Sequence, residues 1–363
     1  MTPLETLLAR RIASAGPMTL AQFMAEALGH PRYGYYMRRD PFGVEGDFVT
    51  APEISQMFGE LIGLWVASVW HQMGEPTAYR LVELGPGRGT LMADALRALA
   101  LDDRARRAAD VRLVETSPAL AALQRARLDG VDAAWHESVA EVPRGPLIVI
   151  ANEVFDALPV HQIERTPKGW RERMIGLDGG DRLRLALAPG PTPASAFVEQ
   201  ARADRPLGTV VEIGPAAIAL ADVLARRVAA DGGAALIIDF GDAEPPRLGS
   251  LQAVRDHRRS EVLDSPGNVD LAAAVDFGAL ARAAREAGAR AFGPIEQGAF
   301  LRALGIEDRA SRLSRGATPD QRAAIDAALH RLVVAEAMGC LFKAFVIAHP
   351  ALAAPAGFAE PCR

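Results

Sequence analysis

The residues from Glu83 to Thr90 carry the strongest chemical pattern in the sequence, because an acid is followed there by Gly85, Gly87 and Gly89. An apolar run ends at the acid, and a helical pattern begins after the last glycine. Such a loop would aim backbone N–H groups and the positive end of a helix dipole at a ligand. Dinucleotide-binding loops space their glycines as G-x-G-x-x-G, and Thr90 stands where that pattern has its last glycine. A Walker loop would need Gly-Lys-Ser/Thr, which this stretch does not supply.

An acid at the end of a strand, directly before alternating glycines, resembles the first motif of class I methyltransferases. The resemblance implies that Gly85, Gly87 and Gly89 let the backbone approach the amino-acid end of S-adenosylmethionine. It also implies that Glu83 lies beneath the sulfonium side of this cofactor, where a carboxylate favours cationic groups. The alternative is a glycine-rich turn kept only for tight packing between a strand and a helix.

Glu115 ends a second apolar stretch, and in the resembled fold an acid at this place accepts hydrogen bonds from both ribose hydroxyls. Dehydrogenases place an acid similarly, so Glu115 indicates a nucleoside ligand but does not distinguish S-adenosylmethionine from a dinucleotide. A solvated acid at a strand end is the alternative. The resemblance further implies adenine contacts from the stretch after the next strand, which contains Ser138 and Val139.

A group of polar residues follows a fourth apolar stretch, in the order Asn152, Glu153 and Asp156. Open α/β sheets bind their ligands at the carboxyl ends of the strands, which is where these residues would lie. Two acids and an amide beside Phe155 and Pro159 are costly to leave without a partner. We therefore predict catalytic or acceptor-binding roles for Asn152, Glu153 and Asp156, although Asp156 could instead cap a helix.

An earlier segment places Asp47, Thr50, Glu53 and Gln56 beside apolar core positions. It could fold over the cofactor as a lid that excludes water, with Thr50 among the cofactor-binding residues. It could equally be a helix start, with Thr50 at the end of the loop and Glu53 in the first turn. His257 is a weaker candidate for the site, because a lone histidine is more often structural.

The elements that would position these residues form an α/β pattern. Strands that are apolar throughout and separated by helices are typical of a parallel sheet buried on both faces. The sequence therefore predicts a doubly wound, Rossmann-like class I methyltransferase sheet. The predicted strands are Tyr79–Gly85, Val111–Thr116, Ala133–Trp135, Pro146–Asn152 and Ala234–Gly241.

Other stretches fall outside this alternation. Residues 1–76 are mainly helical, with one helix predicted from Pro3 and another after Pro52, and they include the possible lid. Residues 77–363 would form the cofactor-binding domain. Turn signals divide residues 160–188 into an inserted antiparallel meander. Residues 302–340 read as a polar helical insert, with a helix beginning after Thr318.

Composition excludes several classes of protein. The 363 residues carry a formal net charge of −5, which argues against a nucleic-acid-binding surface. Cys340 and Cys362 are too few for a disulfide framework or a four-cysteine zinc site, and we predict no metal. The sequence contains no run of about 20 apolar residues, so it predicts no membrane span. The Arg-bearing amino terminus could resemble a transit peptide, but an ordinary first helix is favoured. We therefore predict a cytoplasmic protein of a bacterium.

Several motifs together resemble the MidA family, the methyltransferase-like proteins needed for assembly of respiratory complex I. They are PEISQMFGE, ELGPGRGT, ANEVFDALPVHQ, IIDFGD, GSLQAVRDH and MGCLFKAF, and the resemblance extends from about Tyr33 to Val346. The resemblance implies S-adenosylmethionine as cofactor and, as methyl acceptor, an arginine of a complex I core subunit. Glu153 and Asp156 are then the candidates to bind the guanidinium.

Other functions remain open at this stage. The same fold could methylate a small molecule, since fold does not decide substrate. A non-catalytic assembly factor could retain the cofactor pocket. A nicotinamide-dependent dehydrogenase is disfavoured by the glycine spacing. The sequence does not indicate an oligomeric state.

Overall fold

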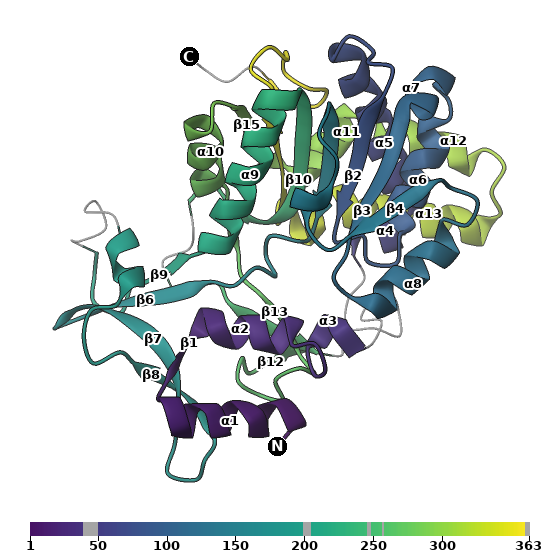
Figure 1. Cartoon of the computed structure of the whole chain (residues 1–363). Coiled ribbons are helices and arrows are strands. Elements are labelled where there is room, and N and C mark those ends of the chain that lie inside the picture. The colour runs from purple at the N-terminus through teal and green to yellow at the C-terminus, as the bar shows by residue number, and fades with distance from the viewer. Residues whose placement is uncertain (39–49, 199–204, 245–247, 256–257, 360–363) are drawn as a thin grey trace.

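The computed structural model describes residues 1–38, 50–198, 205–244, 248–255 and 258–359. It contains two parts, a large α/β core and a smaller lobe that includes the amino terminus (Figure 1). None of the helices in these ranges is long and apolar enough to cross a membrane.

The core is an eight-stranded sheet in the order β15-β16-β10-β5-β2-β3-β4, with β14 also paired to β10. Neighbouring strands from β10 to β4 are parallel, and β16 is antiparallel to both β10 and β15. This confirms the doubly wound α/β sheet. Its strands are β2 (Tyr79–Leu84), β3 (Ala109–Val114), β4 (Ala133–His136), β5 (Leu147–Asn152), β10 (Gly233–Asp242), β14 (Val275–Asp276), β15 (Arg290–Glu296) and β16 (Phe342–Ala348).

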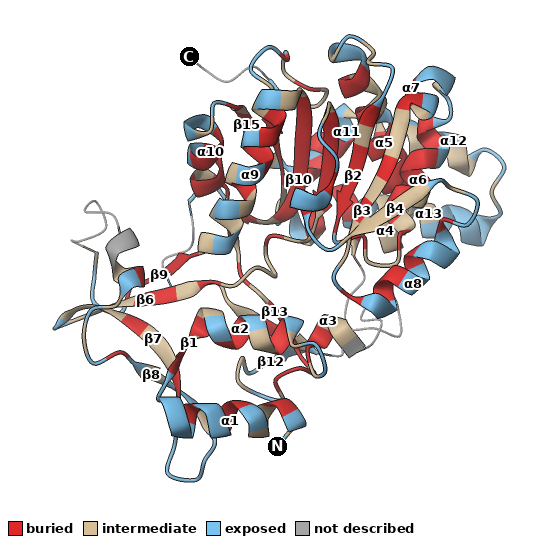
Figure 2. Cartoon of the chain, viewed as in Figure 1, coloured by how far each residue is buried: buried red, intermediate tan, exposed pale blue. Residues whose placement is uncertain are grey.

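Both faces of the sheet are buried (Figure 2). Side chains alternate along each strand, and helices pack against the apolar side chains on each face. Ile148 packs on one side of β5 and Val149 on the other. One face is covered by α5 (Gln56–Gln72), α6 (Thr90–Leu99), α11 (Gln297–Ala303), α12 (Ile306–Ser314) and α13 (Pro319–Val333). The opposite face is covered by α9 (Pro215–Asp231) and α10 (Phe277–Glu286). The remaining core helices are α4 (Ala51–Ile54), α7 (Asp103–Ala108), α8 (Pro118–Arg127) and the short turns η1 (Val139–Glu141) and η4 (Ala335–Gly339).

The smaller lobe combines the amino terminus with the predicted meander. Strand β1 pairs with β7 of the meander, and β9 pairs with β6, so five strands form one sheet. Side chains of α1, α2, β7, β11 and β13 share one apolar cluster there. The lobe contains α1 (Pro3–Ala15), β1 (Met18–Thr19), α2 (Leu20–Gly29), α3 (Tyr35–Arg38), β6 (His161–Thr166), β7 (Gly169–Leu177), β8 (Leu183–Leu187), η2 (Pro193–Phe197), β9 (Val210–Ile213), β11 (Gln252–Arg255), β12 (Arg258–Ser260) and β13 (Asp270–Ala272).

Two of the differences from the sequence prediction concern helices. The single helix expected after Pro52 is two helices, α4 and α5, because Ser55 is extended and its hydroxyl accepts the Met57 N–H at 3.2 Å. The helical insert is also less solvated than its polarity suggested. Its Arg309 pairs with Glu60 of α5 at 2.7 Å, and Glu60 is buried.

Candidate functional site

The glycine loop joins β2 to α6 in a conformation that only glycine adopts readily. Gly85, Gly87 and Gly89 all have positive φ, at 56°, 56° and 78°. A Cβ on Gly85 would lie 3.0 Å from Val154 Cγ2, so this position is crowded as well as left-handed. The loop therefore exposes backbone at the amino end of α6, as its sequence predicts.

Glu83, at the end of β2, is buried beneath this loop with 3% of its surface exposed. Its Oε2 atom has no hydrogen-bond partner among the described residues. Burial raises the pKa of Glu83 well above its ordinary value, the nearby Glu115 raises it further, and only a bond from the Met92 backbone opposes this. An unsatisfied buried carboxylate is costly unless a ligand completes its hydrogen bonds.

Glu115 follows β3 and is held by two donors. Its Oε1 accepts the Ser117 N–H at 2.8 Å, and its Oε2 accepts Gln124 Nε2 at 2.9 Å. The same Gln124 nitrogen donates to the Gly87 carbonyl at 2.9 Å, while Gln124 Oε1 accepts the Trp135 indole N–H at 2.9 Å. Gln124 is fully buried and connects the glycine loop to Glu115. Sequence reasoning missed it because a glutamine within a helix carries no motif.

Glu153 comes directly after β5 and is a non-glycine residue with a φ of +54°. Its Oε1 accepts the Ala51 N–H at 3.2 Å and Asn152 Nδ2 at 3.0 Å. Burial raises the pKa of Glu153, and these two bonds lower it. The Oδ1 atom of Asn152 is buried without a hydrogen-bond partner within the described ranges. A left-handed glutamate of this kind is a form of strain that concentrates at functional sites.

Asp156 lies in a turn rather than at a helix start. Leu158 N–H bonds to the Phe155 carbonyl at 3.2 Å, and residues 153–160, all described, contain no helix. The helix-cap alternative for Asp156 is therefore wrong. Burial raises the pKa of Asp156 well above its ordinary value, and Asp239, Asp270 and Glu153 raise it further.

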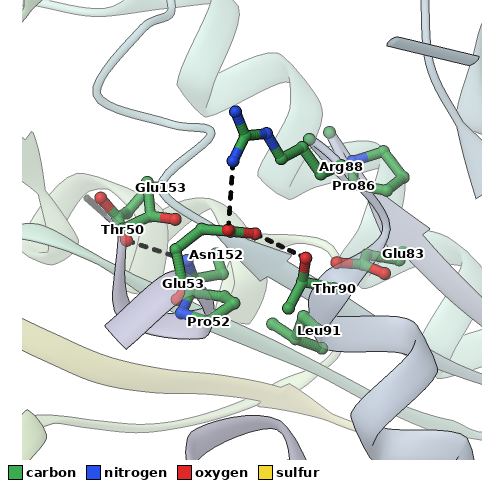
Figure 3. A pocket seen from close by; sticks show the side chains of 12 residues that line it. Thr50, Pro52, Glu53, Glu83, Pro86, Arg88, Thr90, Leu91, Asn152 and Glu153 are labelled. Atoms are coloured by element: carbon green, nitrogen blue, oxygen red, sulfur yellow. Dashed lines mark hydrogen bonds and ion pairs between the residues drawn. The ribbon is translucent and has the colours of Figure 1, made fainter. Parts of the chain in front are cut away.

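Helix α4 contacts the glycine loop directly through Glu53 (Figure 3). Glu53 accepts Thr90 Oγ1 at 2.5 Å and Arg88 Nη1 at 3.5 Å. Thr50 is the N-cap residue of α4, but its side chain makes no capping bond within the described part of the chain. The helix start predicted for this segment is nevertheless confirmed, with Glu53 in the first turn of α4. Gln56 is exposed, whereas Asp47 and His257 lie outside the described residues.

Ser138 and Val139 lie just after β4, where Ser138 caps η1 through a 3.2 Å bond from the Ala140 N–H. Ser138 is exposed, and Val139 is buried in the core. Neither belongs to the linings of the two cavities described next. Their contact with adenine stays a prediction.

Two cavities meet at the carboxyl ends of β2 and β5. A cleft of about 40 Å³ lies over Glu83, and its lining includes Thr50, Glu53 and Asn152. A larger cavity of about 340 Å³ contains Glu115 in its wall, and α2 and α3 close its far side. Gly85, Gly87 and Glu153 line both. The glycine loop and Glu153 thus lie between two adjacent spaces.

The far wall of the larger cavity comes from the smaller lobe. Tyr36 lines it and donates its hydroxyl to Asp270 Oδ1 at 2.8 Å. Burial and Asp270 raise the pKa of Tyr36 well above its ordinary value, so it stays a donor. Asp270 belongs to β13, a strand that the sequence prediction did not include. Tyr36 and Asp270 are therefore site residues that sequence reasoning missed.

The residues present fit S-adenosylmethionine. The unpartnered oxygens of Glu83 and Asn152 would accept hydrogen bonds from its ammonium group. Glu115 retains acceptor capacity for the ribose, because a carboxylate offers about four acceptor sites and Ser117, Gln124 and Thr116 donate to it. Figure 3 shows Glu83, Asn152 and Glu153 around the same cleft.

Comparison with known proteins gives a consistent result. A family model described as S-adenosyl-L-methionine-dependent methyltransferase matches residues 61–295. "Protein arginine methyltransferase NDUFAF7, mitochondrial" of Rattus norvegicus is 40% identical over 335 residues, spanning 85% of this chain and 76% of that protein. The Homo sapiens protein of that name is 39% identical over 335 residues, spanning 85% of this chain and 75% of that protein. A Burkholderia thailandensis crystal structure bound to S-adenosyl-homocysteine superposes with a TM-score of 0.87 at 29% identity, covering 98% of this chain and 93% of that one.

Proposed function

The chain belongs to a family of S-adenosyl-L-methionine-dependent methyltransferases, and we propose that it methylates an arginine side chain of a partner protein. The cofactor supplies an electrophilic methyl group on a sulfonium centre. The acceptor is inferred in part from the relatives that are about 40% identical and are named protein arginine methyltransferases. The roles of the individual site residues are part of this proposal.

One observation carries the proposal, namely that Glu153 lines both the cofactor cleft and the larger cavity. The larger cavity also has Glu115 in its wall, so an acceptor side chain bound there would reach Glu153 beside the cofactor. The wall of that cavity is largely apolar, with Met24, Leu28 and Leu158 among its side chains. An arginine has the complementary shape, with an aliphatic stem and a charged planar end.

The carboxylates suit a guanidinium for two reasons. Guanidinium presents a fixed fork of donors that a carboxylate accepts as a pair, which would hold the attacking nitrogen in line with the methyl group. Methyl transfer also releases a proton from that nitrogen. Burial raises the pKa of Glu153, which lines both cavities, so its carboxylate is a stronger base than an exposed one.

The partner and the compartment are parts of the same proposal. The MidA resemblance favours a core subunit of respiratory complex I, or its homologue, as the protein substrate. The curated relatives are named as mitochondrial proteins, whereas we infer the cytoplasm of a bacterium for this chain from its composition. The exposed edge of the meander, with Leu185 and Leu187 on β8, gives the smaller lobe additional surface for a protein partner.

The test is a methyl-transfer assay with labelled S-adenosylmethionine and a panel of acceptors. Arginine-containing peptides from complex I core subunits should be methylated, whereas matched peptides with lysine at the same position should not. Glu153→Gln should lower kcat by about 100-fold or more, because it removes a charged partner of the acceptor and a proton acceptor. Glu286→Gln, an exposed change on α10, is the matched control.

Two outcomes would contradict the proposal. Methylation of free small molecules in preference to every peptide would indicate a small-molecule methyltransferase. Full support of complex I assembly in cells by a Glu153→Gln protein that transfers no methyl groups would indicate a non-catalytic assembly factor.

A further inference from the structure

Asp239 lies on β10, three residues before the strand ends at Asp242, and is completely buried. Its Oδ2 atom accepts three consecutive backbone N–H groups, from Val154 at 3.1 Å, Phe155 at 2.8 Å and Asp156 at 3.3 Å. Its Oδ1 atom accepts the N–H of the adjacent Phe240 at 2.8 Å. One side chain therefore holds the backbone of the turn at residues 154–156, which follows the neighbouring strand β5.

The turn has little regular structure of its own to hold it. Residues 153–160 are described throughout and belong to no helix or strand. The Glu153 N–H still bonds to the Ile238 carbonyl at 2.9 Å, as a last rung of the pairing between β5 and β10. Beyond that rung the chain turns, and the next three N–H groups converge on Asp239. Converging N–H groups of this kind form a binding site for an acceptor oxygen, and here the Asp239 carboxyl group occupies it.

The conformation of Glu153 explains why such support is needed. A glutamate with a φ of +54° is in a left-handed conformation that persists only where the surroundings hold it. The N–H groups that Asp239 binds begin at the very next residue. Releasing them would let Glu153 relax toward an ordinary conformation, and its carboxylate would leave the junction between the two cavities.

We propose that Asp239 is a positioning residue for methyl transfer, which holds the 153–156 turn so that Glu153 faces the acceptor. The inference rests on the proposed function, since it assumes that Glu153 acts on the acceptor. The cofactor side is held by different contacts, because Gln124 and Ser117 orient Glu115. Asp239 should therefore matter for transfer far more than for cofactor binding.

The first experiment is backbone hydrogen exchange on the full-length protein, which needs no acceptor. In the wild type, the amides of Val154, Phe155 and Asp156 should be protected. Asp239→Asn keeps the size of the side chain but replaces one acceptor oxygen by a donor, and it should speed their exchange by about tenfold to 100-fold. Asp242→Asn is the matched control, because Asp242 is exposed on the same strand, accepts the Ala243 N–H and pairs with Lys343 at 3.9 Å.

The second experiment separates transfer from binding. Asp239→Asn should lower kcat by at least about tenfold while the Kd for S-adenosylmethionine stays within about threefold of the wild-type value. Asp239→Ala should have a larger effect on kcat than Asp239→Asn. Melting temperatures measured beside the kinetics show whether each variant is folded.

Three results would overturn the inference. One is rapid exchange of the three amides in the wild type, which can be measured even if no variant folds. Another is faster exchange in Asp239→Asn with an unchanged kcat. The third is a loss of cofactor binding as large as the loss of kcat. If the wild type methylates no arginine peptide, the proposed function fails, while the exchange measurement still tests the turn.

Discussion

The proposed cofactor side and the proposed acceptor side of the site are built in different ways. On the cofactor side, Glu83, the glycine loop and Glu115 belong to consecutive strand–loop–helix units. Gln124 joins them across sequence separations of 37 residues to Gly87 and nine to Glu115. On the acceptor side, Ala51 reaches Glu153 across 102 residues, and Tyr36 reaches Asp270 across 234.

This difference has a functional consequence. The cofactor side can form as soon as two adjacent βα units of the sheet pack together. The acceptor side needs the smaller lobe, α4, the 153–156 turn and β10 in place at once. Changes on the cofactor side should therefore appear in the Kd for S-adenosylmethionine, and changes on the acceptor side in kcat or in the KM of the acceptor.

The largest effect on binding is expected from Glu83→Gln. This change removes the buried carboxylate whose Oε2 has no partner among the described residues. The Kd for S-adenosylmethionine should rise by about tenfold to 100-fold, because hydrogen bonds to charged groups contribute about 1.5–3 kcal/mol. Isothermal titration calorimetry would measure it, with Glu286→Gln as the control. An unchanged Kd would show that Glu83 does not bind the cofactor.

Gln124→Leu tests whether the cofactor side depends on one buried amide. The change leaves the Gly87 carbonyl, Glu115 Oε2 and the Trp135 indole N–H without their partner. We expect the Kd for S-adenosylmethionine and for its demethylated product to rise by about tenfold, with kcat at saturating cofactor nearly unchanged. A fall in kcat without a change in Kd would contradict the division into two sides.

The pH dependence of binding sharpens the assignment of Glu83. Its pKa in the free protein is raised above the ordinary value of 4.5, so it holds a proton up to a higher pH than an exposed glutamate. Binding a cation beside it releases that proton, and affinity should increase by up to about tenfold per pH unit until the raised pKa is passed. Titrations in buffers of different ionisation enthalpy would measure the released proton. In Glu83→Gln this pH dependence should be reduced, and its full persistence would assign the proton to another group.

The same raised pKa predicts the sign of a stability change. The folded state binds this proton more tightly than the unfolded state, so the contribution of Glu83 to the free energy of unfolding falls as pH rises from 4.5 through the raised pKa. Thermal melting of the free wild type and of Glu83→Gln over this range would show the difference.

The smallest effect is expected from Tyr36→Phe, on the acceptor side. It removes only the hydroxyl that bonds to Asp270 at 2.8 Å. Losing one buried hydrogen bond of about 1 kcal/mol should raise the KM of the acceptor peptide by about fivefold. The Kd for S-adenosylmethionine should not change. If that Kd rises while the acceptor KM does not, the wall formed by α3 serves the cofactor instead.

The sequence predicts the core of this fold well, since all five expected strands are present in the parallel part of the sheet. Each of these strands is an apolar run that predicts a buried strand from its own residues. The sheet of β11, β12 and β13 was not predicted, because its strands are short and only partly apolar. The break at Ser55 was also missed, since the residues on both sides of it have a helical pattern.

What the sequence determines by itself is the glycine loop of the proposed cofactor side, although not the buried Gln124 that joins it to Glu115. Glu83 and the glycines are adjacent in the chain, so their spacing already implies the backbone conformation and the ligand chemistry. Only the tertiary structure decides which residues complete the acceptor side. Asp239 and Asp270 are unremarkable acids in the sequence, and they become site residues because strand register and lobe packing bring them to the 153–156 turn and to Tyr36. Contacts between such distant positions depend on the packing of the whole chain, which no local pattern encodes.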